Sequence, residues 1–408
     1  MERIIFHIDV NNAFLSWTAI DLLNNGYKYD IRDSYAVIGG DPKLRKGIVL
    51  AKSNLCKKLG IYTSMTLYEA SKKCRNLRVY PPNYKFYSYM SNELFKLLSK
   101  YTPDIEVASI DECYLDYGKV KKLYGDELEF AKKIQKEIYE TLKFTVNIGI
   151  ANNKLCAKMA SDFSKPNKIH TLYDHEIQDK MYPLPISDLF LVGKKTSEKL
   201  INLGIKTIGD LANFDYYTLY KYFKNQASFL INQAKGIDDS IVDSSTFVPK
   251  GISNEITLDK DITQKELLYP YLMNLSELLG TRVREQKKYA HVICVILKDN
   301  YFKRKSHQKK LVNATNVTSE IYNISKEILD EMWNDEPIRL IGIRLDKLVE
   351  NINYQASLFG EDNNIEESKF DNVLDDLKKK YGSSIINKAS LTNSKIKKNL
   401  DLKNDLRK

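Results

Sequence analysis

The sequence has no long run of apolar residues. No stretch approaches the roughly 20 consecutive apolar residues that a bilayer-spanning helix needs. The first ten residues, MERIIFHIDV, alternate in character and do not form the apolar core of a signal peptide. We therefore expect a cytoplasmic protein with no membrane partner.

Cysteine is also scarce, with five residues in 408. They form no CxxC pair and have no histidine at metal-ligand spacing, so a disulfide framework and a structural zinc site are excluded as the basis of the fold. We expect all five to be buried as small apolar side chains. They are Cys56, Cys74, Cys113, Cys156 and Cys294.

Acidic residues are outnumbered by basic ones, with 53 Asp and Glu against 63 Lys and Arg and a formal net charge of +10. This balance favours a polyanionic partner such as nucleic acid, and a well-solvated basic surface is the alternative interpretation. The length of 408 residues predicts about two to four domains.

Strand and helix patterns alternate through the first 170 residues, which predicts an α/β layer. An irregular segment at 28–80, with short strands and a lysine-bearing helix, interrupts the layer and predicts a small inserted subdomain. The elements expected in the layer are a strand at 3–10, a helix carrying Phe14 and Leu23, two strands within 105–117, a helix with apolar positions from Leu128 to Leu142, a strand at 144–150 and a helix at 153–163.

The pattern changes after Pro185, where the chain is predicted to be helical as far as residue 235. Residues 251–348 again combine strands and helices and end in the strand pattern PIRLIGIRLDKL. The last fifty residues are mostly polar. One amphipathic stretch, from Phe370 to Tyr381, predicts a helix that ends at Gly382.

The stretch IEVASIDECYLDYG places two acids, Asp111 and Glu112, next to each other between predicted strands. Because neighbouring residues of a strand point to opposite faces, we predict a tight turn at Ser109 to Asp111 that lets both carboxylates approach one point. Asp9, at the end of the first strand, would complete a carboxylate site of the kind that Mg²⁺ prefers if the two segments are neighbours. The alternative is that Asp111 and Glu112 are ordinary turn acids.

Four motifs follow one another along the chain: FHIDVNNAFLSW, VASIDECYLDY, NIGIANNKLCAKMASDFSKPN and LVGKKTSEKLINLGIKTIGDL. In this order and spacing they resemble the motifs of Y-family translesion DNA polymerases, in particular those of the DNA polymerase IV type (UmuC/DinB), and the resemblance spans residues 3–360. It implies an α/β and α+β multidomain fold, the right-hand polymerase architecture. The implied domains are a palm at 1–27 and 80–168, small fingers at 28–79, a helical thumb with a helix-hairpin-helix at 169–243, an α/β little finger at 250–350 and a flexible tail at 351–408.

The resemblance also implies the catalytic residues. Asp9, Asp111 and Glu112, assisted by the Val10 carbonyl, would hold two Mg²⁺ ions, with Glu112 nearest the primer 3′-hydroxyl. Two such ions can stabilise both the attacking and the leaving oxygen of an in-line displacement.

The incoming deoxynucleoside triphosphate would bind at the start of the first helix. Backbone N–H groups there would cradle the phosphates, and Phe14 matches the family's steric gate against a 2′-hydroxyl; a plain core aromatic is the alternative. Lys57 and Lys165 are the candidate phosphate-binding lysines, and Lys158 is interpreted as structural or DNA-facing. The chain departs from the family in carrying SNLCK where many relatives carry SYEAR, which replaces a bidentate guanidinium by an ammonium. The residues expected to offer N–H groups are Asn11, Asn12, Ala13 and Phe14.

Two segments are expected to contact primer-template DNA. The turn from Val192 to Thr196 resembles a helix-hairpin-helix, whose N–H groups hold a backbone phosphate irrespective of sequence. A basic run near residue 305 would lie in the little finger and contact the template backbone, although a solvated charge run is the alternative. The residues concerned are Gly193, Lys194, Lys195, Thr196, Lys303, Arg304 and Lys305.

Past the last predicted strand, the segment QASLFG resembles a sliding-clamp binding peptide, with Gln355, Leu358 and Phe359 as its anchors. Taken together, the resemblance implies a monomeric, low-fidelity, template-directed DNA polymerase without proofreading, which extends primers past damaged bases. Two alternatives remain at this point: a palm-domain nucleotide cyclase, and a DNA-binding scaffold of the same fold with weakened catalysis.

Overall fold

The computed structural model describes residues 3–41, 47–245, 249–350, 364–382 and 386. Residues 3–40 and 48–245 belong to one compact unit, and residues 249–350 and 364–382 belong to a second. Within the described residues, no helix is long and apolar enough to cross a membrane.

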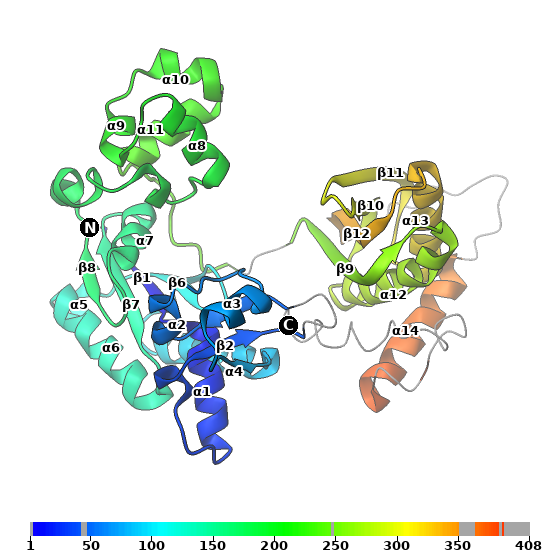
Figure 1. Cartoon of the computed structure of the whole chain (residues 1–408), viewed down its shortest axis with the longest axis horizontal. Helices are drawn as coiled ribbons and strands as arrows, with labels where there is room; N and C mark the ends of the chain where they lie inside the picture. Colours follow the sequence, from blue (N-terminus) through cyan, green and yellow to red (C-terminus); the bar gives the residue numbers. More distant parts are fainter. Residues whose placement is uncertain (1–2, 42–46, 246–248, 351–363, 383–385, 387–408) are drawn as a thin grey trace. The chain divides into compact units, whose positions relative to one another are not determined.

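The centre of the first unit is a five-stranded sheet in the order β5-β6-β1-β7-β8 (Figure 1). All its neighbours are antiparallel except β7 and β8. Both faces of β1 are covered, since every residue of that strand is buried. The strands are β5 (Ile105–Val107), β6 (Glu112–Asp116), β1 (Ile5–Val10), β7 (Val146–Ala151) and β8 (Ile169–Thr171).

The two faces of β1 pack against different helices. Phe6 and Ile8 point into a core with α1, α4 and α6, whereas His7 and Asp9 lie on the face that α7 covers, where His7 contacts Ser161 of α7. The sequence-predicted strand and helix elements of this layer are confirmed. The helices are α1 (Ala13–Asn24), α4 (Tyr84–Leu98), α5 (Lys121–Tyr124), α6 (Glu127–Leu142) and α7 (Lys154–Asp162).

Gly149 of β7 allows α7 to lie unusually close to the sheet. A Cβ atom at this position would lie 2.0 Å from the Ala157 carbonyl oxygen of α7, which no side chain can accommodate. Asn153 fixes the start of the helix by accepting from the Cys156 N–H at 2.8 Å, as an N-cap. The position of α7 over β1 is therefore set by local sequence on both elements.

The predicted inserted subdomain is present as a three-stranded sheet in the order β3-β2-β4 with two short helices. Ser53 and Thr66 cap the helices, accepting from the N–H groups of Cys56 and Glu69. The elements are β2 (Ala36–Gly39), β3 (Val49–Lys52), α2 (Asn54–Lys58), α3 (Leu67–Lys73) and β4 (Arg78–Tyr80), preceded by a 3₁₀ turn, η1 (Ile31–Asp33).

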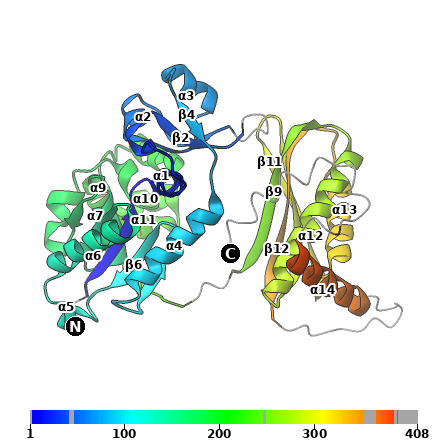
Figure 2. The ribbon, with the colours of Figure 1, turned by 90° about the horizontal axis from the view of Figure 1, so that it is seen from below.

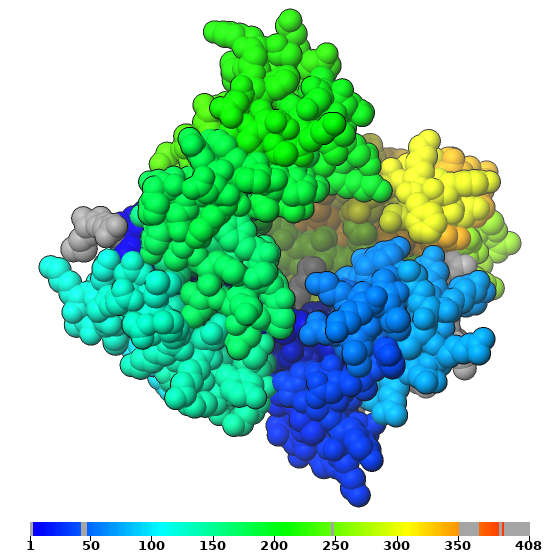
Figure 3. Space-filling model, turned by 60° about the vertical axis from the view of Figure 1, so that its left-hand side comes forward, coloured from blue at the N-terminus to red at the C-terminus, as the bar shows by residue number. Residues whose placement is uncertain are grey.

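Short helices follow β8, as predicted, and share one apolar core with α7. In the space-filling view, the surface is hollowed between the green segment that follows α7 and the blue inserted subdomain (Figure 3). The helical elements are η3 (Asp174–Glu176), η4 (Ile177–Met181), η5 (Ile186–Asp188), α8 (Lys194–Asn202), α9 (Ile208–Ala212), α10 (Tyr216–Phe223) and α11 (Gln226–Ala234).

The second unit is an antiparallel four-stranded sheet in the order β11-β10-β12-β9, with α12 and α13 packed on one face (Figure 2). The predicted C-terminal helix, α14, packs on this unit through polar contacts, because Arg284 pairs with Asp371 at 3.0 Å and Asp375 at 2.6 Å. The elements are β9 (Gly251–Ile262), η6 (Lys265–Leu268), α12 (Tyr269–Glu285), β10 (Tyr289–Asp299), β11 (Arg304–Thr315), α13 (Thr318–Met332), β12 (Ile338–Val349) and α14 (Asn364–Tyr381). All five cysteines are free and buried, as predicted.

Candidate active site

The sheet of the first unit brings Asp9 and Glu112 together. They are direct partners in the antiparallel pairing of β1 with β6, at the ends of both strands. The predicted turn before Glu112 is confirmed: β5 ends at Val107, the Ala108 and Ser109 N–H groups both donate to the Glu112 carbonyl at 3.0 and 3.1 Å, and β6 begins at Glu112. Two acids far apart in sequence therefore share one edge of the sheet.

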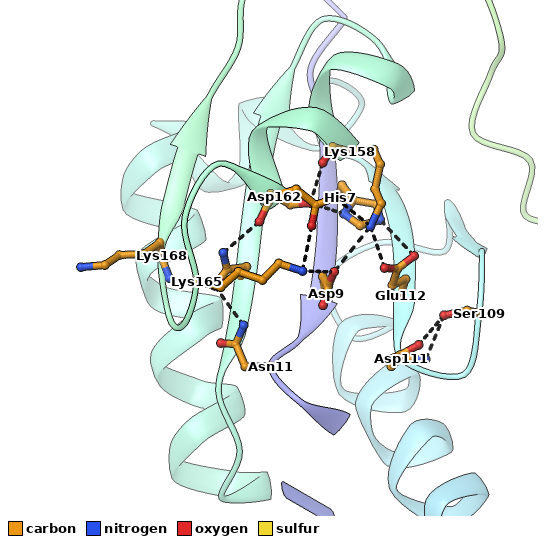
Figure 4. A network of polar contacts seen from close by, with 12 residues as sticks. His7, Asp9, Asn11, Ser109, Asp111, Glu112, Lys158, Asp162, Lys165 and Lys168 are labelled. Atoms are coloured by element: carbon orange, nitrogen blue, oxygen red, sulfur yellow. Dashed lines mark hydrogen bonds and ion pairs between the residues drawn. The ribbon is translucent and has the colours of Figure 1, made fainter. Parts of the chain in front are cut away.

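Asp111 lies in the turn itself and its carboxylate does not join the pair. It accepts from the Ser109 hydroxyl at 2.5 Å, and that hydroxyl accepts from the Asp111 N–H at 3.2 Å. Figure 4 shows Asp111 to one side of Asp9 and Glu112. In the described part of the chain, no three His, Cys, Asp or Glu side chains are grouped closely enough to hold a metal ion. A shared metal site would need the Asp111 side chain to rotate away from Ser109.

Two lysines occupy the space beside the acids (Figure 4). The Lys158 Nζ lies 2.6 Å from Glu112 Oε1 and 3.5 Å from Asp9 Oδ2. The Lys165 Nζ lies 2.6 Å from the same Asp9 oxygen. Lys158 was interpreted from the sequence as structural or DNA-facing, and the structure places it, largely buried, in ion pairs with the two acids.

Asp162, at the end of α7, contacts both lysines. Its two carboxylate oxygens lie 3.3 Å from the Lys158 Nζ and 2.8 Å from the Lys165 Nζ. Our sequence analysis did not identify Asp162, although its spacing of four and three residues from the lysines is a helical pairing signal. His7, fully buried, completes the cluster with its Nε2 3.8 Å from Glu112 Oε2.

Burial and charge perturb these groups in opposite directions. Burial raises the pKa of Asp9 to about 6, against the opposing charge of Lys165. Burial would also raise the pKa of Glu112, but His7 and Lys158 hold it well below its usual range. Burial lowers the pKa of His7, which keeps the ring neutral.

This donor set fits a hard divalent cation. Asp9 and Glu112 supply carboxylate oxygens at one edge of the sheet, and each already has an ammonium group at 2.6 Å. Buried carboxylates need a positive partner, and Mg²⁺ binds through one or two carboxylates together with substrate phosphates. The residues present can therefore accept such an ion once the ammonium groups move.

Phe14 forms part of an aromatic stack at the start of α1. Its ring stacks on Tyr87 of α4 with centroids 4.6 Å apart and an interplanar angle of 11°. The Tyr87 hydroxyl is 2.6 Å from the Thr18 hydroxyl, which donates to the Phe14 carbonyl at 2.7 Å. Phe14 is only partly buried, so one side of a rigidly supported ring remains available to a ligand.

Asn11 and Asn12 have structural roles at the same helix start. The Asn11 N–H donates to the Thr145 carbonyl at 2.9 Å and its side chain accepts from the Asn167 N–H at 2.8 Å, so this N–H does not face a ligand in this structure. Asn12, with φ 54°, precedes α1 without a side-chain cap and donates its amide to the Lys52 carbonyl. The first N–H groups of a helix have no intrahelical acceptor, and those of Ala13 and Phe14 are in this position.

Lys57 is exposed on α2 and has a lysine neighbour that our sequence analysis missed. Lys52, at the end of β3, has its pKa lowered by burial and then by the charge of Lys57. Its ammonium donates to the Thr63 hydroxyl at 3.2 Å. The alternation of buried and less buried residues in β3 could have indicated Lys52. Its side chain lies on the face of the strand opposite to that of the buried Ala51.

The predicted helix-hairpin-helix turn lies between η5 and α8. Gly193 is the N-cap of α8, without a side-chain cap, and Lys194, Lys195 and Thr196 form the first turn of that helix. Backbone N–H groups at such an end can bind an anion.

The basic run of the second unit does not form one patch. Arg304 pairs with Glu255 of β9 at 2.5 Å, whereas Lys305 pairs with Glu336 at 2.6 Å. Successive residues of a strand point to opposite faces, so these two neighbouring cations of β11 face different ways. Lys303 precedes the strand and is exposed. The clamp-peptide residues Gln355, Leu358 and Phe359 lie outside the described residues.

Three family models match this chain. Residues 8–162 match the impB/mucB/samB family, residues 249–358 match the C-terminal domain of that family, and residues 174–205 match the IMS family HHH motif. The DNA polymerase IV of Clostridium acetobutylicum is 46% identical over 392 residues, covering 96% of this chain and 98% of that protein. The DNA polymerase IV of Alkaliphilus oremlandii is 37% identical over 402 residues, covering 96% and 99%.

Solved structures show the same likeness. A Y-family DNA polymerase chimera of Dbh and Dpo4 matches with a TM-score of 0.73 and 27% identity, covering 85% of this chain and all of that chain. An insertion ternary complex of Dbh DNA polymerase matches with a TM-score of 0.60 and 26% identity over the same shares.

The fold and these matches define the class of protein as a DNA-directed DNA polymerase. More particularly, the chain belongs to the impB/mucB/samB family, the Y-family polymerases, and is of the DinB type. The predicted fold class, including the helix-hairpin-helix, is confirmed.

Proposed function

We propose that this chain is a low-fidelity translesion DNA polymerase, which extends primers on damaged templates in DNA repair and works with two Mg²⁺ ions and without proofreading. The observation that carries the proposal is the pairing of Asp9 with Glu112 at one sheet edge, with the Lys158 ammonium in contact with both acids and the Lys165 ammonium in contact with Asp9. The family relationship supports template-directed synthesis.

Asp9, Asp111 and Glu112, with the Val10 carbonyl, would hold the two ions. When bound, the ions supply Lewis-acid activation of the primer 3′-hydroxyl and charge stabilisation of the leaving pyrophosphate. Glu112 would orient the primer end, since it is the acid that begins β6 beside Asp9. The pairing of β1 with β6 holds the backbones of Asp9 and Glu112 in place before substrate arrives.

The chain's own cations would bind the triphosphate. Lys165 has a side chain that is 35% exposed, so it can turn from Asp9 to a phosphate oxygen. Lys57 would approach from α2, and the N–H groups of Ala13 and Phe14 would contact phosphate at the start of α1. The Phe14 ring, supported by Tyr87, would exclude a ribose 2′-hydroxyl.

DNA would be held without base preference. The α8 start, with Gly193 to Thr196, would bind one backbone phosphate, and Lys303, Arg304 and Lys305 would contribute from the second unit. That Dbh was solved as an insertion ternary complex supports binding of DNA and nucleotide together.

We further propose the domain allocation predicted from the sequence, with palm, fingers and thumb in the first unit and the little finger in the second. The protein would act as a cytoplasmic monomer and would bind a sliding clamp through Gln355, Leu358 and Phe359. Deleting residues 355–359 should remove stimulation by a clamp and leave basal synthesis intact. Equal stimulation after the deletion would reject the clamp assignment.

Primer extension on undamaged and abasic templates tests the main proposal. The wild type should copy both, and Asp111→Ala should abolish synthesis although the Asp111 carboxylate contacts Ser109 in this structure. Failure of the wild type to pass the abasic site would reject the translesion role. Full activity of the variant would show that Asp111 is not a ligand.

A further inference from the structure

Asp162 has no part in the function proposed above, yet it contacts both lysines of the acid site. It is the last residue of α7, and its side chain is 47% exposed, compared with 8% for Asp9. One oxygen faces Lys158 and the other faces Lys165 (Figure 4). It is thus the outermost carboxylate of a cluster whose other members lie deeper.

The formal charges of the cluster do not cancel. Three carboxylates, on Asp9, Glu112 and Asp162, contact the two ammonium groups of Lys158 and Lys165. The net charge is therefore −1. A divalent cation that binds Asp9 and Glu112 is attracted by this negative charge but repels both ammonium groups. It must displace Lys158 from Glu112 and Lys165 from Asp9, each of which lies 2.6 Å from its acid.

Each lysine needs another anionic partner when it leaves. Lys158 has a side chain that is 11% exposed, and a buried ammonium without a partner is costly. Of the carboxylates that contact the two lysines in the described ranges, Asp162 is the one that the proposed metal site does not use. Lys158 lies four residues before Asp162 on α7, and Lys165 lies three residues after the helix ends. Both ammonium groups already contact the Asp162 carboxylate, at 3.3 and 2.8 Å, so side-chain rotation can transfer them from the other acids to Asp162.

We propose that Asp162 is a positioning residue: it receives Lys158 and Lys165 when divalent cations occupy Asp9 and Glu112, and so favours cation binding. The proposal rests on the two-metal function. It assigns Lys158 the opposite effect, because its ammonium competes with the cations for Glu112 and Asp9.

Two variants follow with opposite expected signs. Asp162→Asn changes the net charge of the cluster from −1 to 0 and leaves both lysines to bind the acids, so the Kd for a divalent cation should rise by about tenfold. Lys158→Met changes the net charge to −2 and removes a competitor, so the Kd should fall by a similar factor. If Asp162 and Lys158 merely supported the fold, both substitutions would weaken binding of the divalent cation, or neither would change it.

Titration of the full-length protein with Mn²⁺, without DNA or nucleotide, measures these constants by the electron paramagnetic resonance of the free ion. Asp179→Asn is the matched control for the acid, since Asp179 is an exposed residue of η4 and takes no part in the ion pairs of the cluster. Lys168→Met is the control for the base, because Lys168 points away from the acids in Figure 4. Both controls should keep the wild-type Kd. Circular dichroism at each titration temperature verifies that every variant is folded.

The outcomes are distinct. Absence of Mn²⁺ binding by the folded wild type would reject the two-metal function itself. Wild-type binding that Asp162→Asn leaves unchanged or tightens would overturn the role of Asp162 alone. If Lys158→Met does not fold, Lys158→Gln takes its place and the Asp162→Asn result still decides the proposal.

Discussion

The acid site of the first unit and the outer strand of the second unit's sheet both pair basic with acidic side chains, but the pairs differ in exposure. Lys158 and Asp9 have side chains 11% and 8% exposed, whereas Arg304 and Glu255 are 52% and 28% exposed. Exposed pairs contribute little and are screened by salt, so a DNA phosphate can replace Glu255. Buried pairs lack that freedom and must exchange one cation for another.

Removing an acid from the buried site should have the largest effect. Asp9→Asn should lower single-turnover primer extension by about a thousandfold, because the proposed Mg²⁺ site would lose a ligand and with it several kcal/mol of transition-state charge stabilisation. Rapid-quench kinetics at saturating nucleotide measures this rate. A loss smaller than tenfold in a folded variant would show that the buried pair is structural.

Removing the Phe14 ring should have the next largest effect. Phe14→Ala should improve ribonucleotide incorporation relative to deoxynucleotide by about tenfold to a hundredfold, because the ring that would exclude the 2′-hydroxyl is removed. Competing extension with ribonucleotides and deoxynucleotides measures the ratio. Tyr89→Ala, on the exposed side of α4, is the control and should leave the ratio unchanged. Unaltered sugar discrimination in Phe14→Ala would mean that the gate lies elsewhere.

The exposed cations should have a smaller effect that depends on salt. Arg304→Ala and Lys303→Ala should each reduce the slope of log Kd against log salt for primer-template DNA by about 1, the loss of one phosphate contact. Lys305→Ala should reduce it less, because Lys305 lies on the opposite face of β11 from Arg304. Fluorescence anisotropy over a range of salt concentrations measures the slopes. Equal slopes for all three variants would refute the division of the basic run between two faces.

Breaking the exposed ion pair between Lys305 and Glu336 should have the smallest effect. Glu336→Gln should leave the free energy of unfolding of the second unit unchanged within error in urea titration, since exposed pairs of this kind often contribute nothing measurable. A clear destabilisation would remove the distinction between buried and exposed pairs in this protein.

The sequence predicts what depends on local pattern. Alternation located β1 and its terminal Asp9, and the adjacency of Asp111 and Glu112 required a turn, which the structure contains. The ion pairs of Lys158 with Asp9 and Glu112 could not be predicted in this way. They depend on how closely α7 packs over β1, which is a property of the tertiary structure. The position of Asp162 beside the acids depends on the same packing of α7.

The basic run shows a second limit. A cluster of charges within eight positions suggests one surface, but a strand distributes its side chains over two faces, and the partner of each is set by other elements. Arg304 pairs across the sheet with β9, and Lys305 pairs with the segment after α13. Neither partner is near in sequence.

Gly149 has a consequence for the electrostatics of the site. It is the Cα partner of His7 across β1 and β7, and α7 contacts its backbone where a Cβ would be. A methyl group there would lift the helix that carries Lys158 and leads to Lys165, and both ammonium groups would withdraw from carboxylates that no substitution had touched. The distances between the two lysines and the acids are thus set by how closely α7 packs on β7 at Gly149, and a substitution at this uncharged, buried position should change the affinity of the site for cations.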